Sequence, residues 1–211
     1  MFAGRPQCEI RATFIESEMQ TATLTSAKVQ GMPSPWRGLW VLGVVVLLVS
    51  GTHAQSATAG EYQIKAAFLF NFAKFVEWPP SSFSDGSAPL QICVLGQDPF
   101  GEVLRNITRE KNVNGHKLEV HQIVDLQLAR TCHILFIASS EKAQLKRIFE
   151  SLEGSAALTV GDVKEFIQQG GMINFVLEND RVQFEVSRKA AEQAGLKISS
   201  KLLAVAKVVT G

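Results

Sequence analysis

The alternation of apolar and polar residues is clearest over residues 171–186, in the stretch GMINFVLENDRVQFEV. Asn179 and Asp180 both tolerate positive φ, so they predict a two-residue turn and a β-hairpin in which Phe175 faces Phe184. In this register the hairpin has one apolar face and one mixed face. The apolar face carries Ile173, Phe175, Leu177, Val182, Phe184 and Val186, and the mixed face carries Asn174, Val176, Glu178, Arg181, Gln183 and Glu185.

Upstream of the hairpin, one long apolar segment is followed by an alternation of short apolar runs and helical segments. Residues 61–80 predict a helix that Pro79 and Pro80 end, and its apolar positions cover so much of its circumference that it must be buried on several sides. Short apolar runs bounded by turn residues predict buried strands. Strands are expected at 90–96, 116–123, 132–139 and 157–160, and helices or helical turns at 98–107, 125–131, 141–152, 163–169 and 187–209.

Polar residues at the predicted helix ends support these boundaries. Asp98 is expected as an N-cap, and Asp162 with Glu165 forms a capping box for residues 163–169. Gly195 breaks the last helical segment, and a serine at 199 or 200 restarts it. Strands alternating with helices and ending in an antiparallel hairpin predict α/β architecture. We expect a single three-layer α/β/α domain, Rossmann-like, with a mixed sheet that ends in the hairpin and a C-terminal helix.

The first 54 residues do not have the pattern of a globular domain. Arg37 precedes an apolar run of about a dozen residues and then small residues up to Ala54, which is typical of a signal peptide and shorter than the roughly 20 residues of a membrane span. We expect cleavage after Ala54; cleavage after Ala57 and an uncleaved anchor are the alternatives. Because Met32 begins an ordinary leader, residues 1–31 are a mis-assigned start or a real extension. The expected parts are therefore 1–31, a signal peptide at 32–54, a flexible tail at 55–60 and one domain at 61–208.

Cysteine and charge composition change once the leader is removed. Cys8 is lost, and Cys93 and Cys132 remain as an even pair in an oxidising compartment. In a doubly wound order they lie on neighbouring strands, which predicts a disulfide; two buried thiols are the alternative. Residues 1–54 carry four of the 21 basic and three of the 20 acidic side chains, so 17 of each remain. A neutral chain without basic runs argues against nucleic acid as a partner.

Residues that suggest chemistry do not form a catalytic pattern. Gly96 and Gly101 lie between a strand and a helix, but their spacing does not match the dinucleotide motif GxGxxG. Cys132 and His133 are adjacent in a strand and point to opposite faces, which argues against a metal site shared with the other histidines. The sequence contains neither CxxC nor GxSxG. We therefore expect no enzyme activity, no cofactor and no metal.

The aromatic content of the first helix exceeds what one contact between a helix and a sheet needs. Trp78 stands at the end of this helix, before two prolines. Aromatic side chains that are not part of the core would anchor a partner. The residues concerned are Phe68, Phe70, Phe72, Phe75 and Trp78.

The stretch from residue 61 to 207 resembles the YfiR family of periplasmic proteins. The blocks that carry the resemblance are YQIKAAFLFNFAKFVEWP, ICVLGQDPFG, LFIASSE, GGMINFVLENDRVQFEV and AAEQAGLKISSKLLAVAK. The resemblance implies a periplasmic repressor that binds the periplasmic domain of a YfiN-like inner-membrane diguanylate cyclase. By holding the cyclase inactive, such a repressor lowers cyclic di-GMP and biofilm formation.

The resemblance also implies roles for particular residues. The disulfide of the family maps onto Cys93 and Cys132, whereas the second cysteine pair of some relatives has no counterpart here. Trp78, Phe175 and Glu185 are implied as the partner-binding residues, although the hairpin register places Phe175 on the apolar face. The alternative function is a periplasmic small-molecule sensor with an apolar pocket between the aromatic helix and the hairpin. A homodimer and a small-molecule ligand both stay open.

Overall fold

The computed structural model describes residues 53–209. The predicted extension and all but the last two residues of the predicted signal peptide lie outside this range. The helices are α2 (His53–Phe75), η1 (Pro80–Ser82), α3 (Glu102–Thr108), α4 (Leu126–Ala129), η2 (Ser139–Gln144), α5 (Leu145–Ser151), α6 (Arg188–Gln193) and α7 (Ser200–Leu203). The strands are β1 (Val76–Glu77), β2 (Leu90–Leu95), β3 (Asn112–Val113), β4 (His116–Ile123), β5 (Ile134–Ile137), β6 (Leu158–Gly161), β7 (Ile173–Glu178), β8 (Arg181–Val186), β9 (Lys197–Ile198) and β10 (Lys207–Val208).

The main sheet is mixed, as predicted. Within residues 53–209 it has eight strands in the order β10-β8-β7-β6-β5-β2-β4-β3. The central strands β4, β2, β5, β6 and β7 are parallel, and β10 joins β8 in parallel. The pairs β7–β8 and β3–β4 are antiparallel. The short strands β1 and β9 pair with each other outside this sheet.

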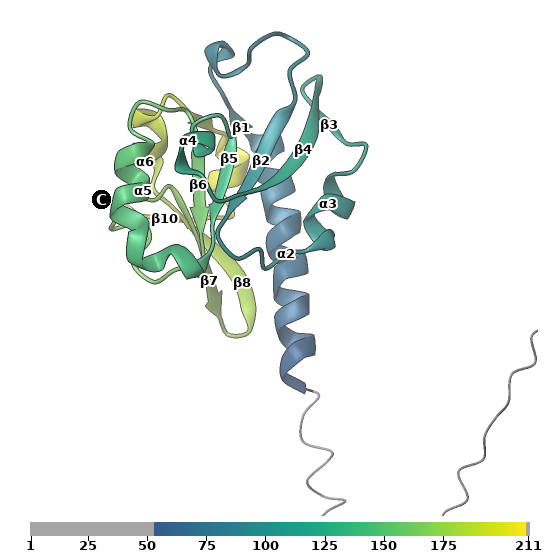
Figure 1. The fold of residues 1–211 in the computed structure, drawn as a ribbon. Helices are drawn as coiled ribbons and strands as arrows, with labels where there is room; N and C mark the ends of the chain where they lie inside the picture. Colours follow the sequence, from purple (N-terminus) through teal and green to yellow (C-terminus); the bar gives the residue numbers. More distant parts are fainter. Residues whose placement is uncertain (1–52, 210–211) are drawn as a thin grey trace, which may run out of the picture. The chain divides into compact units, whose positions relative to one another are not determined.

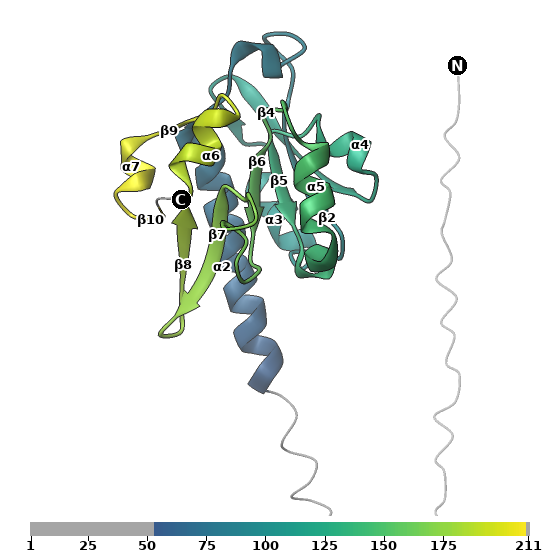
Figure 2. The ribbon, with the colours of Figure 1, turned by 90° about the vertical axis from the view of Figure 1, so that its left-hand side faces the viewer.

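Helices cover both faces of the sheet (Figures 1 and 2), and a hydrophobic core lies on each face. Successive residues of a strand point to opposite faces, so Ile92 belongs to the core that α2 and α3 cover, while Cys93 belongs to the core that α4 and α5 cover. Leu69 of α2 and Ile148 of α5 are among the buried residues that close the two faces. The three-layer α/β/α architecture predicted from the alternation of strands and helices is therefore confirmed.

The hairpin has the predicted register. Phe175 pairs with Phe184, and the turn residues Asn179 and Asp180 have φ values of 50° and 58°. Such a turn matches the twist of the two strands because both central residues have positive φ. The apolar face is buried in the half of the hairpin that is far from the turn. Toward the turn it becomes exposed, and Leu177 there is 57% exposed. The hairpin thus extends beyond the core that covers its first half.

The boundaries of the long helix differ from the prediction at both ends. α2 already begins at His53, so residues 55–60 are helical where we expected a flexible tail. It ends at Phe75 and not at the prolines, because Val76–Glu77 forms β1 and pairs with Lys197–Ile198. The amide of Ser199 also donates to the Phe75 carbonyl at 2.9 Å. A partner strand more than 100 residues away thus ends the helix.

The predicted capping box at residues 162–165 is wrong. Residues 163–170 form turns, and Glu165 has a φ of 65°, which a helix does not allow. The ring of Phe166 is fully buried and lies against Gly161 and Gly171, where a Cβ at either position would overlap it. Because this ring is buried between two backbone segments, the residues around it do not form a helix. Asp162 therefore caps no helix and contacts another part of the chain.

Two smaller expectations also change. Asp98 accepts from the amides of Phe100 (2.8 Å) and Gly101 (3.3 Å), so it forms the turn before α3, whose N-cap is Gly101. The C-terminal segment is helical only in α6 and α7. Its remaining parts pair as β9 and β10 with strands from elsewhere in the chain. Ser199 is the N-cap of α7, in agreement with one of the two predicted positions.

Candidate functional site

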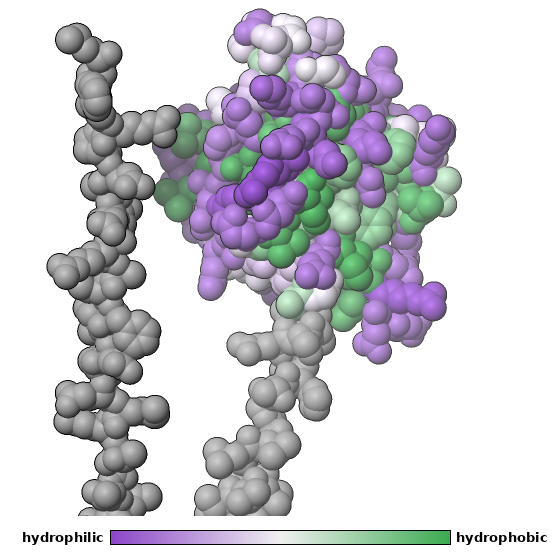
Figure 3. Space-filling view, turned by 90° about the vertical axis from the view of Figure 1, so that its right-hand side faces the viewer, coloured by the Kyte–Doolittle hydropathy of each residue, from purple (hydrophilic) through white to green (hydrophobic). Residues whose placement is uncertain are grey.

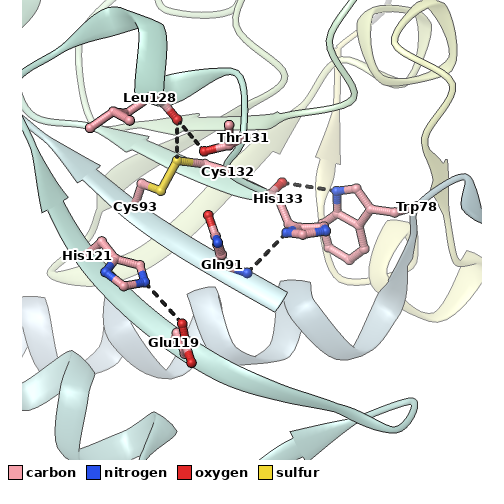
Figure 4. The surroundings of a disulfide bond; sticks show 9 residues. All are labelled: Trp78, Gln91, Cys93, Glu119, His121, Leu128, Thr131, Cys132 and His133. Atoms are coloured by element: carbon pink, nitrogen blue, oxygen red, sulfur yellow. Dashed lines mark hydrogen bonds and ion pairs between the residues drawn. A yellow bond between two sulfur atoms is a disulfide. The ribbon is translucent and has the colours of Figure 1, made fainter. Parts of the chain in front are cut away.

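Cys93 and Cys132 form a disulfide between neighbouring parallel strands (Figure 4). Cys93 lies in β2, and Cys132 comes shortly before β5, which pairs with β2. The two Cα atoms are 5.9 Å apart, within the usual range for a disulfide. Both residues are buried in the core beneath α4 and α5. The bond therefore ties two central strands together inside the domain.

Trp78 follows β1 and packs at the amino-terminal edge of the sheet. Its indole N–H donates to the carbonyl of His133 at 3.0 Å, as Figure 4 shows. Beside it, the Phe83 ring stacks between two imidazoles, with centroid distances of 3.9 Å to His116 and 4.3 Å to His133. These contacts fix the loop between η1 and β2 against the starts of β4 and β5.

His133 is a buried neutral imidazole. Its Nδ1 accepts a hydrogen bond from the Gln91 amide at 3.1 Å, so the neutral ring carries its proton on Nε2. Burial, and to a lesser extent the nearby His116, lowers the pKa of His133 to about 4. His133 is only 5% exposed, so its side chain is part of the interior and not of the surface.

Phe175 lies inside an aromatic cluster between the hairpin and α2. Its ring centroid is 5.8 Å from that of Phe72 and 6.0 Å from that of Phe68, and Phe184 packs edge-on against both α2 rings. Phe175 is only 3% exposed. Its ring thus offers no surface to a partner in this conformation and instead supports Phe68 from behind.

Glu185 lies on the mixed face of the hairpin, where Lys207 of β10 stands beside it. The Lys207 ammonium is 3.0 Å from a Glu178 carboxylate oxygen and 3.8 Å from one of Glu185. The hydrogen bond and charge of Glu178 raise the pKa of Lys207. These three side chains form a charged row across β7, β8 and β10, in which the Glu185 side chain is 19% exposed.

The structure does not bring the three expected partner-binding residues to one surface. Trp78 is at the amino-terminal edge of the sheet, near the start of β5. Glu185 pairs with Asn174, which in turn lies beside Gly161 at the carboxyl end of β6. Phe175 and Glu185 point to opposite faces of the hairpin because their positions alternate.

A buried ionic cluster joins α2 to the loop after β6, and the sequence analysis missed it. The Lys65 ammonium lies 2.7 Å from Asp162 and 2.6 Å from Glu61. The Tyr62 hydroxyl donates to the same Asp162 oxygen at 2.9 Å, and burial followed by the Asp162 charge raises the pKa of Tyr62. A lysine within an otherwise apolar helix was the available signal, because a buried ammonium needs a carboxylate partner.

An exposed apolar surface extends over the middle of α2 and the outer half of the hairpin. Figure 3 shows hydrophobic surface on this side of the molecule, next to the hydrophilic end of the hairpin. Ile64 is 48% exposed, and a hollow of ≈ 280 Å³ beside it is lined entirely by α2 residues. We name this region the α2–hairpin surface and define it by Ile64, Ala67, Phe68, Leu177 and Val182.

The position at which doubly wound α/β proteins bind ligands is closed here. In this fold class ligands occupy the crevice beyond the carboxyl ends of the strands, where the strand order reverses. That point lies between β2 and β5. Ser140 and Glu141 pack against Gly96 there, and the Gln97 amide donates to the Ser140 hydroxyl at 3.0 Å. Side chains of the protein thus fill the space that a nucleotide phosphate would need.

Two features are absent from residues 53–209, the part of the chain that the structure describes. No three or more His, Cys, Asp or Glu side chains gather there in an arrangement that could hold a metal ion. None of the helices in that part has both the length and the apolar character required to cross a membrane.

Two solved structures are distantly similar to this chain. A conserved domain protein from Vibrio cholerae O1 biovar El Tor aligns with a TM-score of 0.45 and 12% identity. The ABC domain in complex with L-Trp from Streptococcus pneumoniae aligns with a TM-score of 0.42 and 10% identity. Each alignment covers 57% of this chain, and the chain spans about half (55%) of each of these proteins. Among curated proteins, no sequence matches.

Comparison with protein families gives a match over most of the described chain. The matching model is described as YfiR/HmsC-like, and it covers residues 62–207. This range begins in α2, ends in β10 and includes the disulfide, the Lys65–Asp162 ion pair and the hairpin. The chain therefore belongs to the YfiR/HmsC-like family.

Proposed function

We propose that this protein is a periplasmic negative regulator that binds the periplasmic domain of an inner-membrane diguanylate cyclase. By holding the cyclase inactive, it lowers cyclic di-GMP signalling and biofilm formation. The family match over residues 62–207 carries this proposal, since the resemblance to YfiR implies a periplasmic regulator of such a cyclase.

Repression by binding requires only that the protein prefers one state of the cyclase. If the bound surface has a higher affinity for the inactive arrangement of the periplasmic domain, binding shifts the equilibrium toward that arrangement. A shift from about 99% active to about 99% inactive cyclase requires an affinity for the inactive state that is about 10⁴-fold higher. No chemical step by the regulator is needed.

The α2–hairpin surface and the adjoining charged row are the proposed contact region. Leu177 and Ile64 supply exposed apolar area of the kind that is buried when a protein partner binds. Glu185 and Lys207 supply charges on the opposite, mixed face of the same hairpin, where they would select the partner by complementarity. Phe175 contributes from the interior by holding Phe68 in place.

Co-purification with a detergent-solubilised cyclase tests the surface. We expect Leu177→Lys and Glu185→Lys to weaken capture and to raise cyclic di-GMP in cells. Leu128→Lys is the matched control, because Leu128 is 51% exposed but lies on α4, on the opposite side of the sheet. Trp78→Ala tests whether the separate position that follows β1 also contributes to cyclase binding. If both hairpin variants bind and repress like the wild type, this surface is not the binding site.

The second candidate function is that of a small-molecule sensor, and one observation favours it. The space between α2 and the hairpin, where we expected an apolar pocket, is filled by the Phe68, Phe72 and Phe175 rings. A cavity of ≈ 500 Å³ instead lies beside Trp78. A ligand that raises the melting temperature of the purified protein, together with a lack of affinity for any cyclase domain, would favour this function.

A further inference from the structure

The cavity beside Trp78 has the dimensions of a small-molecule site. Its volume of ≈ 500 Å³ falls within the roughly 300–1,000 Å³ of ligand pockets. It opens at the amino-terminal edge of the sheet, between the end of α2 and the starts of β2 and β4. Neither the disulfide nor the α2–hairpin surface contributes to its walls.

The walls of this cavity are mainly aromatic and aliphatic. Trp78 forms one wall, and its orientation is fixed because its N–H donates to the His133 carbonyl. Phe83 and His116 form another wall, and the stacking of their rings holds the two side chains in place. Leu90 and other aliphatic side chains complete the lining. Such walls favour a ligand with an apolar body.

The charged groups that line the cavity are both acidic. They are the carboxylates of Glu77 and Asp85, and neither lysine nor arginine is among the lining residues. The hydroxyl and the amide of Ser87 donate to Asp85 and lower its pKa, so this carboxylate stays ionised at neutral pH. Lys197 lies opposite Glu77 in the β1–β9 pair. Glu77 is exposed and lines the cavity, so its carboxylate is accessible to a ligand.

From this combination we propose that the cavity binds a small organic cation, namely an amine or quaternary ammonium with an apolar body. The carboxylates attract the positive charge, and the face of an indole is the aromatic surface that binds cations best. The same carboxylates repel an anion of equal shape. This site lies away from the proposed cyclase-binding surface, and its existence does not depend on the repressor function.

Trp78 provides a direct readout of binding. The chain has three tryptophans, and the predicted cleavage removes Trp36 and Trp40. In the exported protein purified from the periplasm, indole fluorescence therefore reports on this cavity alone. Phenethylamine is the cationic probe, 2-phenylethanol the neutral analogue and 3-phenylpropionate the anionic analogue. We expect phenethylamine to change the fluorescence saturably, with a Kd about tenfold below that of 2-phenylethanol.

Variants separate the role of charge from that of shape. The double variant Glu77→Gln with Asp85→Asn keeps the side-chain sizes and should abolish the preference for phenethylamine over 2-phenylethanol. Glu150→Gln removes an exposed carboxylate on α5 and should leave the preference unchanged. Equal or tighter binding of 3-phenylpropionate, unchanged binding by the double variant, or no saturable binding of phenethylamine would each overturn the proposal. Cyclase capture by the same double variant is expected to be normal, so this test and that of the repressor function can fail separately.

Discussion

Removal of the disulfide should destabilise the protein strongly without changing its fold. The perturbation is the double variant Cys93→Ala with Cys132→Ala, which replaces both buried sulfurs by small apolar side chains. The bond spans a sequence separation of 39 residues. In the chain-entropy account, closing a loop of that length restricts the unfolded chain and contributes about 4 kcal/mol to the free energy of unfolding.

This contribution is a large part of the total stability. Domains of this kind unfold with about 5–15 kcal/mol, so the variant should lose between roughly a quarter and four fifths of its stability. For a domain of this size about 1 kcal/mol shifts the midpoint of thermal unfolding by roughly 2–4 °C, which gives an expected decrease of about 8–16 °C.

Guanidinium unfolding followed by Trp78 fluorescence measures the effect. Treatment of the wild type with a phosphine reductant should reproduce the loss, whereas the same treatment should leave the double variant unchanged. A loss below about 1 kcal/mol, with both proteins unfolding in a single transition, would refute the reasoning from loop length. Normal cyclase binding by the folded double variant would indicate that the bond stabilises the domain and does not switch it.

Three further predictions concern buried charge and the hairpin turn. Because the pKa of His133 is about 4 in the folded protein against 6.5 ordinarily, the unfolded chain binds an extra proton between these values. Stability should fall by about 1–3 kcal/mol as pH decreases from 6.5 to 4, and His133→Gln should flatten this slope in urea titrations. Asp162→Ala should cost about 3–5 kcal/mol by leaving Lys65 buried with less compensation, and adding Lys65→Met should restore more than half of the loss in the same assay. Asp180→Gly should raise the unfolding free energy by about 0.5–1 kcal/mol, because its φ of 58° suits glycine; a decrease would show that the turn is not strained.

The elements that the sequence predicted well depend on local pattern. The hairpin register followed from the period-2 alternation and from two turn residues that accept positive φ. The three-layer fold followed from strands and helices in alternation, and the disulfide from two cysteines on neighbouring strands. Each of these inferences uses residues close in sequence or a topology that few alternatives satisfy.

The errors arose where a distant segment competes with a local preference. The residues after Phe75 could continue a helix, but Lys197–Ile198 pairs with them as a strand. Residues 163–169 have a capping pattern, but burial of Phe166 against Gly161 and Gly171 is incompatible with a helix there. Asp162 binds Lys65 in place of a helix terminus.

The candidate site divides in the same way. From the sequence alone one can predict an export signal, the absence of the motifs GxGxxG, CxxC and GxSxG and an amphipathic hairpin, because these properties depend on residue types and short spacings. Only the tertiary structure decides that Phe175 is enclosed, that Trp78 and Glu185 lie at opposite ends of the sheet, and that Glu77 and Asp85 face one aromatic cavity. The physical reason is that burial and proximity depend on how helices pack across a sheet, which the periodicity of any single segment does not contain.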